Sequence, residues 1–147
     1  MNQFLISFFT YNYQINQSLA DRFKSYGFQM DGDICRLANH LMNAHQIWLE
    51  RISGNVSLQS PWADFPLESF ADRNQNLYEQ TLALMETCDL DEFISYKNFA
   101  GAGFEKKVSD ILLHVINHST YHRGQIALLM RSKGLEPVAS DYIHWVN

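Results

Sequence analysis

A stretch in the last third of the chain reads His114-Val115-Ile116-Asn117-His118-Ser119-Thr120-Tyr121-His122-Arg123-Gly124-Gln125. Its histidines, His114, His118 and His122, are four residues apart. In an α-helix each residue turns by about 100°, so two such steps rotate by only about 80° and the three imidazoles share one face. Histidine is a mediocre helix former and is costly in a core without polar partners. Two imidazoles at i and i+4 can hold one divalent metal ion, so this spacing predicts a metal site on a helix.

The positions around this helix separate the three histidines. His118 and His122 fall on the same stripe as the core-type residues Ile111 and Leu129, within about 40° of one another. We therefore expect this pair to point inward. His114 lies at the edge of the stripe, one turn earlier, and we expect it to be an interior or rim histidine without a metal.

Apolar residues recur every three or four positions in four segments, at about 3–26, 33–53, 67–88 and 109–133. Four amphipathic helices in a chain of this length favour an all-α fold, a four-helix bundle. The length is also typical of one domain, so we expect residues 1–147 to form a single domain.

Residue types at the helix ends and between the helices refine this prediction. Asp31 or Asp33 is suited to cap the second helix, and Ser109 the fourth. The segments 93–97 and 104–108, with glycines between them, predict a small β-hairpin or an extended crossover, and 141–146 predicts a short C-terminal helix. Because two of the connections are long, a bundle with a crossover is as compatible with the sequence as a simple up-down arrangement.

Composition excludes several classes of function. The net charge is −5 and no run of Lys or Arg exceeds two residues, which argues against a nucleic-acid partner. No apolar run reaches the roughly 18 residues that span a bilayer, and the N-terminus lacks the features of a signal peptide. We expect no membrane partner.

The two isolated cysteines bear on the cellular compartment of the protein, and an aromatic loop bears on its oligomeric state. Cys35 and Cys88 provide no disulfide framework, so we expect a cytoplasmic protein in which both are buried as small apolar residues. The loop at 54–67 carries Trp62 and Phe65 and should pack against the bundle. Aromatic surface around these two residues would suit a homodimer.

A metal site between helices needs a further ligand, and the second helix offers His40 and His45. These residues are five positions apart, about 140° around the helix, so both should not reach one ion. The apolar stripe lies between them, with Leu37 on the side of His40 and Leu41 on the side of His45. Periodicity alone leaves both candidates open.

Three stretches of the chain form a pattern: Tyr11-Asn12, then Leu37-Ala38-Asn39-His40 with Trp48 eight residues after the histidine, and then the segment from His114 to Gln125. In these stretches and their order, the chain resembles the DinB/YfiT-like family of small metal-binding four-helix bundles. One departure is Tyr121, where many relatives carry another histidine, and it concerns the character of the pocket more than the ligands.

The resemblance implies a ligand triad of His40, His118 and His122. Three imidazoles with an open fourth position are typical of catalytic zinc sites, and nickel would suit the same ligands. The family includes members that resemble thiol-dependent transferases acting on bacillithiol or mycothiol. The resemblance thus implies a metal-dependent enzyme, of the thiol S-transferase or hydrolase type, with a low-molecular-weight thiol or another small molecule as substrate.

Two other functions remain open from the sequence. One is a non-catalytic, stress-response metal-binding protein whose ion stabilises the bundle. The other is a homodimeric interaction module with incidental histidines, which requires that the purified protein carry no metal. The metal-dependent enzyme requires an open coordination position at the metal, which separates this hypothesis from the other two.

Groups around the imidazoles should orient them. The candidates are Gln125 and Tyr121 on the fourth helix, Tyr11 or Asn12 on the first, and Arg51 on the second. We expect Arg51 to form a salt bridge, with contact to an anionic substrate as the alternative.

Overall fold

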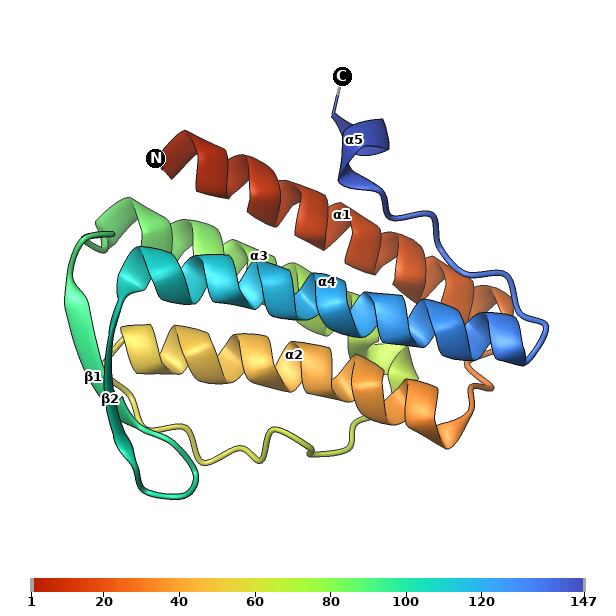
Figure 1. Cartoon of the computed structure of the whole chain (residues 1–147). Helices are drawn as coiled ribbons and strands as arrows, with labels where there is room; N and C mark the ends of the chain where they lie inside the picture. The colour runs from red at the N-terminus through yellow and green to blue at the C-terminus, as the bar shows by residue number, and fades with distance from the viewer. Residues whose placement is uncertain (1, 147) are drawn as a thin grey trace.

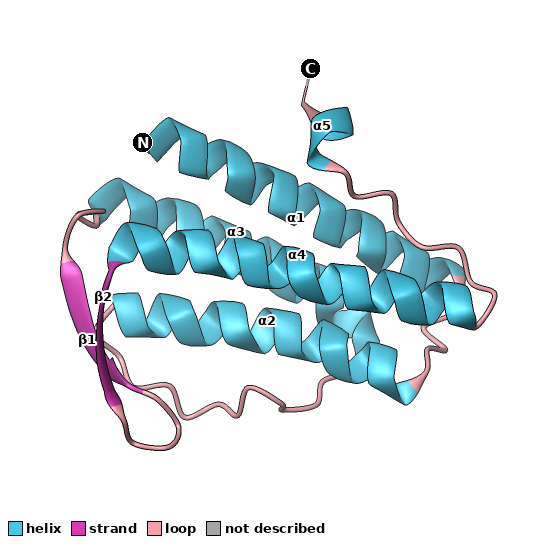
Figure 2. Ribbon diagram, viewed as in Figure 1, coloured by secondary structure: helices cyan, strands magenta, loops and turns pink. Residues whose placement is uncertain are grey.

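The computed structural model describes residues 2–146, so Met1 and Asn147, the ends of the expected domain, lie outside the described residues. The all-α prediction is confirmed, with one small hairpin (Figure 2). The elements are α1 (Asn2–Ser25), α2 (Gly32–Ile52), the short 3-10 turn η1 (Leu67–Ser69), α3 (Phe70–Thr87), β1 (Phe93–Lys97), β2 (Gly103–Lys107), α4 (Val108–Ser132) and α5 (Tyr142–Trp145).

The bundle contains a crossover. Helix α2 packs against α3 and α4, and α1 packs against the same two helices. Figure 1 shows that α2 and α3 run in the same direction, while α4 runs antiparallel to α2. The chain returns from the end of α2 to the start of α3 through residues 53–66, which we call the crossing loop. It follows the outer side of α2 along its length, and this places it beside the face that α2 shares with α4.

The predicted hairpin and C-terminal helix are both confirmed. Strands β1 and β2 are antiparallel, with Phe93 opposite Lys107 and Lys97 opposite Gly103. Gly101 adopts a positive φ of 85° in the turn, a conformation that glycine reaches without strain. Helix α5 is held against α1, where the Trp145 indole donates to Gln14 at 2.6 Å.

The start of α4 differs from the prediction. Ser109 was expected to be the N-cap, but the helix begins at Val108 and the cap position is Lys107, which makes no side-chain cap bond. The backbone N–H groups of Val108 and Ser109 instead donate to the carbonyls of Glu92 and Leu90. The turn that precedes β1 thus supplies the acceptors that a capping side chain would otherwise provide. At α2 the prediction is confirmed, because the Asp31 carboxylate accepts from the backbone N–H of Asp33.

The core has two apolar clusters separated by buried polar residues. One cluster contains Phe23, Ile34, Phe70 and Met130, and the other contains Phe9, Met85, Leu112 and Val115. Between them lies a buried polar layer of Asn12, Asn16, His45, Asn74, Thr81, Ser119 and Arg123. Each of these residues contacts a polar partner, as burial of such groups requires.

Candidate metal centre

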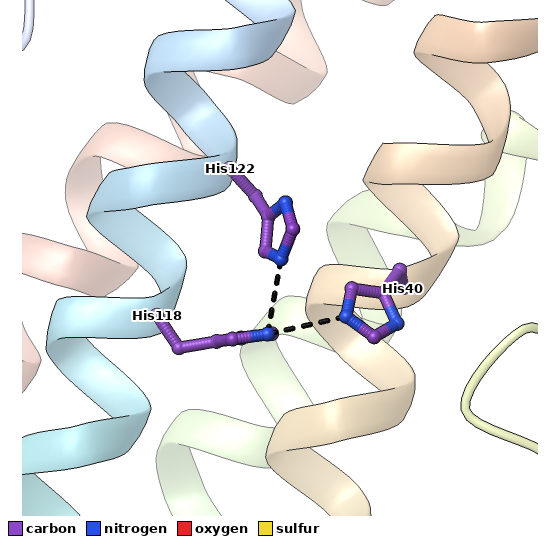
Figure 3. A group of neighbouring side chains, drawn as sticks. All are labelled: His40, His118 and His122. Atoms are coloured by element: carbon purple, nitrogen blue, oxygen red, sulfur yellow. Dashed lines mark hydrogen bonds between the residues drawn. The ribbon is translucent and has the colours of Figure 1, made fainter.

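Three imidazoles from two antiparallel helices converge at the middle of the bundle (Figure 3). Helix α2 supplies His40, and α4 supplies His118 and His122 from successive turns. The Nε2 atom of His118 lies 3.1 Å from Nε2 of His40 and 3.0 Å from Nε2 of His122. The three residues thus each offer one nitrogen to a common point, and these atoms lie within 4.8 Å of one another.

The other ring nitrogens fix the tautomers of two imidazoles. Nδ1 of His40 lies 2.8 Å from the carbonyl oxygen of Pro61, and Nδ1 of His122 lies 2.6 Å from Oε1 of Gln125. Carbonyl oxygens only accept hydrogen bonds, so both Nδ1 atoms must donate a proton. In neutral rings this leaves Nε2 unprotonated, with its lone pair directed at the point of convergence.

This arrangement fits a cation better than it fits hydrogen bonds among the rings. The single N–H that a neutral His118 can place at Nε2 satisfies one of the two facing lone pairs, and the other remains opposed to an electronegative atom. A divalent ion would satisfy all three. Nitrogens bound at about 2.1 Å in a tetrahedral shell are separated by roughly 3.4 Å. The two spacings from Nε2 of His118, 3.1 and 3.0 Å, lie near this value, and the three ligand atoms lie within 4.8 Å of one another. The three imidazoles therefore form a group that could hold a metal ion.

Burial keeps the His40 and His118 rings in the neutral form that binds metals. The pKa of His118 is lowered from 6.5 to about 3, first by burial and then by the neighbouring His122 and His40. Burial likewise lowers the pKa of His40. A neutral imidazole near pH 7 has a lone pair available for coordination.

The crossing loop holds His40 in place. In addition to the Pro61 carbonyl, it contributes Trp62, whose ring stacks on the His40 ring with centroids 3.9 Å apart. Asn43 of α2 donates from Nδ2 to the carbonyls of Pro61 at 3.3 Å and Ala63 at 2.8 Å. The loop is therefore anchored to α2 on both sides of the tryptophan.

Helix α3 reinforces this anchor through Arg73. Its guanidinium donates to Oδ1 of Asn39 at 3.0 Å and to Oδ1 of Asn43 at 2.6 Å, and it lies 3.9 Å from the centre of the Phe65 ring. Asn39 in turn donates to the Phe65 carbonyl at 2.9 Å. The sequence pattern did not point to these residues. The one signal it offered was the presence of two asparagines on the helix that precedes an aromatic loop.

His40, and not His45, belongs to the group of converging ligand atoms. His45 is buried and points to α3, where its Nε2 lies 2.9 Å from the Thr81 hydroxyl. Burial lowers its pKa from 6.5 to about 4. His114 stays outside the cluster, as expected: it is exposed, with its ring 5.5 Å from that of His118 and 5.3 Å from that of Trp48.

Only some of the residues expected to orient the imidazoles lie next to them. Gln125 contacts His122, and its amide nitrogen donates to the Tyr121 hydroxyl at 3.3 Å, which orients Oε1 toward the imidazole. Asn12 does not reach the histidines. It accepts from the buried Arg123, whose guanidinium lies 5.7 Å from the centre of the Tyr11 ring. These two residues of α1 therefore join α1 to α4 instead of orienting a ligand.

The cysteines are also placed away from the three imidazoles. Cys35 and Cys88 are half-buried, where full burial was expected, and burial raises the pKa of each thiol. Within residues 2–146, the group of converging ligand atoms consists of the three imidazoles, without a thiolate or carboxylate.

With its crossing loop and three converging imidazoles, this protein is a small helical bundle of the kind that could hold a metal ion. The sequence profile of the DinB family matches residues 1–146, and the chain belongs to the DinB family. Protein DinB of Bacillus subtilis (strain 168) is 26% identical over 160 residues, covering 97% of this chain and 93% of that protein. A crystal structure of a DinB-like protein from Bacillus cereus ATCC 10987 has the same fold, with a TM-score of 0.68, 22% identity, and coverage of 92% of this chain and 94% of that one.

The helices also bear on the expectation about membranes. Among those of residues 2–146, none combines the length and the apolar character needed to cross a bilayer.

The buried His45 predicts a pH-dependent stability. Its pKa is about 4 in the folded protein and near 6.5 when unfolded, so the unfolded chain takes up the proton first as the pH falls. The contribution of neutral, buried His45 to the unfolding free energy is fully present above pH 6.5, and it is lost as the pH falls from about 6.5 to 4. With a chelator present, lowering the pH from 7 to 5 should cost wild type about 2 kcal/mol more unfolding free energy than His45→Gln. Urea titrations at both pH values measure this. Equal losses in the two proteins would contradict the prediction.

Proposed function

We propose that this protein binds a divalent metal ion, zinc or nickel, through Nε2 of His40, His118 and His122. The observation that carries the proposal is the fixed tautomer of two rings, which directs unprotonated nitrogens from α2 and α4 to one point. Such an arrangement leaves at least one buried lone pair without a donor unless a cation is present.

We further propose that the protein is a metal-dependent enzyme of the thiol S-transferase or hydrolase type. Three protein ligands are typical of catalytic zinc sites, which keep a position for water or substrate. An ion in this place would lower the pKa of a bound water or thiol toward about 7. The resemblance to a family with thiol-dependent members favours a low-molecular-weight thiol as the substrate.

The residues of the chain would support this chemistry by holding the imidazoles. Pro61 and Gln125 fix the protons of His40 and His122 away from the centre, and the Trp62 ring covers one face of His40. His118 has a lowered pKa because of burial, so it stays neutral over a wide range of pH. A rigid set of ligands needs little rearrangement when an ion binds.

The metal content of untagged protein tests the ligand assignment. Wild type should carry about one zinc or nickel ion per chain, and His118→Ala should carry almost none, because two remaining imidazoles bind far more weakly. His114→Ala is the matched control, since it removes an imidazole one turn earlier on the same helix face, and its metal content should equal that of wild type. Elemental analysis by mass spectrometry gives the values. Equal metal content in wild type and His118→Ala would refute the site.

The contact between Gln125 and His122 predicts an effect on metal affinity without loss of a ligand. Gln125→Leu removes the acceptor for Nδ1 and should weaken binding by about 10- to 100-fold, the usual effect of such supporting partners. Gln125→Glu keeps an acceptor at this position and should bind within a few-fold of wild type. Competition with a chromogenic chelator measures both. An unchanged affinity in Gln125→Leu would show that this hydrogen bond does not orient the ligand.

The thiol proposal is tested on cobalt-loaded protein in which Cys35 and Cys88 are replaced by serine. Addition of cysteine or 2-mercaptoethanol should produce a sulfur-to-cobalt charge-transfer band in the near ultraviolet, because a thiolate occupies the open position. The oxygen analogues serine and ethylene glycol are the controls and should give no such band. Absence of the band at saturating thiol would exclude thiol coordination while leaving the metal site intact.

A further inference from the structure

An open cavity lies at the C-terminal end of α2. It has a volume of about 810 Å³ and is lined by the end of α2, the first residues of the crossing loop and the hairpin. Its wall includes Arg51, Val56, Tyr96, Lys97, Phe99 and Phe104. The volume lies within the range of about 300–1,000 Å³ that is usual for small-molecule sites. Arg51 follows His40 by eleven residues, roughly 16 Å along the helix, so the cavity is separate from the three imidazoles.

The state of Arg51 is unusual for a surface arginine. Its guanidinium lies 4.5 Å from the centre of the Trp48 ring, 4.6 Å from that of Tyr96 and 5.7 Å from that of Phe99. The salt bridge that we expected from the sequence is not formed: among residues 2–146, no carboxylate pairs with Arg51. Its hydrogen-bond partner is the Lys97 carbonyl, at a long 3.5 Å.

Ring contacts of this kind position a guanidinium without neutralising it. The rings restrain the side chain and attract its charge, while the N–H edge stays available for a planar anion. A carboxylate or phosphate can accept two parallel N–H bonds from this edge. Arg51 is therefore a preorganised hydrogen-bond donor for an anion, and the described chain supplies no anion to it.

The other residues that line the cavity indicate which kind of ligand would fit it. Lys97 adds a second positive charge and Glu105 a single negative one, so the cavity carries an excess of positive charge in a chain whose net charge is −5. The rings of Tyr96 and Phe104 stack with centroids 5.7 Å apart, and Phe99 and Val56 are largely exposed beside them. Exposed apolar surface of this extent, next to unpaired cations, fits a ligand that is flat and apolar at one end and anionic at the other.

We propose that this cavity binds a small aromatic or otherwise flat apolar anion, whose acidic group is held by Arg51 and whose body lies against Tyr96, Phe99 and Phe104. The site is independent of the metal proposal. The residues that line the cavity do not include the three imidazoles, and the cavity needs no ion to be complete.

Binding of 2-naphthoate tests this proposal, with calorimetry for affinity and amide chemical shifts for location. Wild type should bind the anion, with shifts at Tyr96, Lys97 and Gly103. Arg51→Gln should weaken binding by at least about tenfold, because it removes charge-assisted hydrogen bonds. Arg36→Gln is the matched control: Arg36 is also on α2 and lies 4.1 Å from the centre of the Trp62 ring, but outside the cavity, so affinity should not change.

Two further measurements distinguish anion recognition in this cavity from general apolar adsorption and from binding at the three imidazoles. The neutral 2-naphthamide should bind wild type about as weakly as 2-naphthoate binds Arg51→Gln, and His118→Ala should bind 2-naphthoate as wild type does. If Arg51→Gln fails to fold, Arg51→Lys replaces it and should show weaker but measurable binding, since lysine cannot offer the planar fork. Equal affinity for the acid and the amide, equal affinity in the Arg51 variants and wild type, or loss of binding in His118→Ala would each overturn the proposal.

Discussion

The antiparallel packing of α2 against α4 is the constraint on which the rest of the site depends. It brings one imidazole of α2 opposite two imidazoles of α4, at a depth where bulk water competes little for them. Packing alone would leave each ring free to rotate. The hydrogen bonds to Pro61 and Gln125 remove this freedom and also choose which nitrogen is bare. Backbone packing and tautomer selection together produce a cation-binding geometry.

The crossing loop connects this geometry to the topology of the bundle. Because α2 and α3 run in the same direction, the chain must travel back along α2, and this return passes over His40. Asn39, Asn43 and Arg73 fasten the loop to two helices, so the Pro61 carbonyl and the Trp62 ring are held at defined positions. A simple up-down bundle with a short connection would have no segment in this place. The long loop is thus part of the site.

The chain uses arginine in three distinct environments, and they illustrate how context sets the role of one residue type. Arg123 is buried and joins α1 to α4 through Asn12 and Asn16. Arg73 is half-buried and secures the crossing loop, and burial lowers its pKa to about 10. Arg51 lies among aromatic rings and lines a cavity. None of these three roles follows from the position of the residue on a helical wheel, because each depends on segments distant in the sequence.

The sequence by itself determined the helices, the hairpin and the inward face of α4, because hydrophobic period and the four-residue spacing of His118 and His122 act within one segment. Tertiary structure decided the remainder. Which of His40 and His45 faces His118 and His122 depended on whether α3 or α4 packs against each side of α2. His45 faces α3, where it contacts the Thr81 hydroxyl. The start of α4 at Val108 depended on carbonyls of the turn before β1, and the partners of His40 came from a loop with no periodic signal. Spacing fixes an angle around one helix axis, whereas only the assembled chain fixes which neighbour lies at that angle.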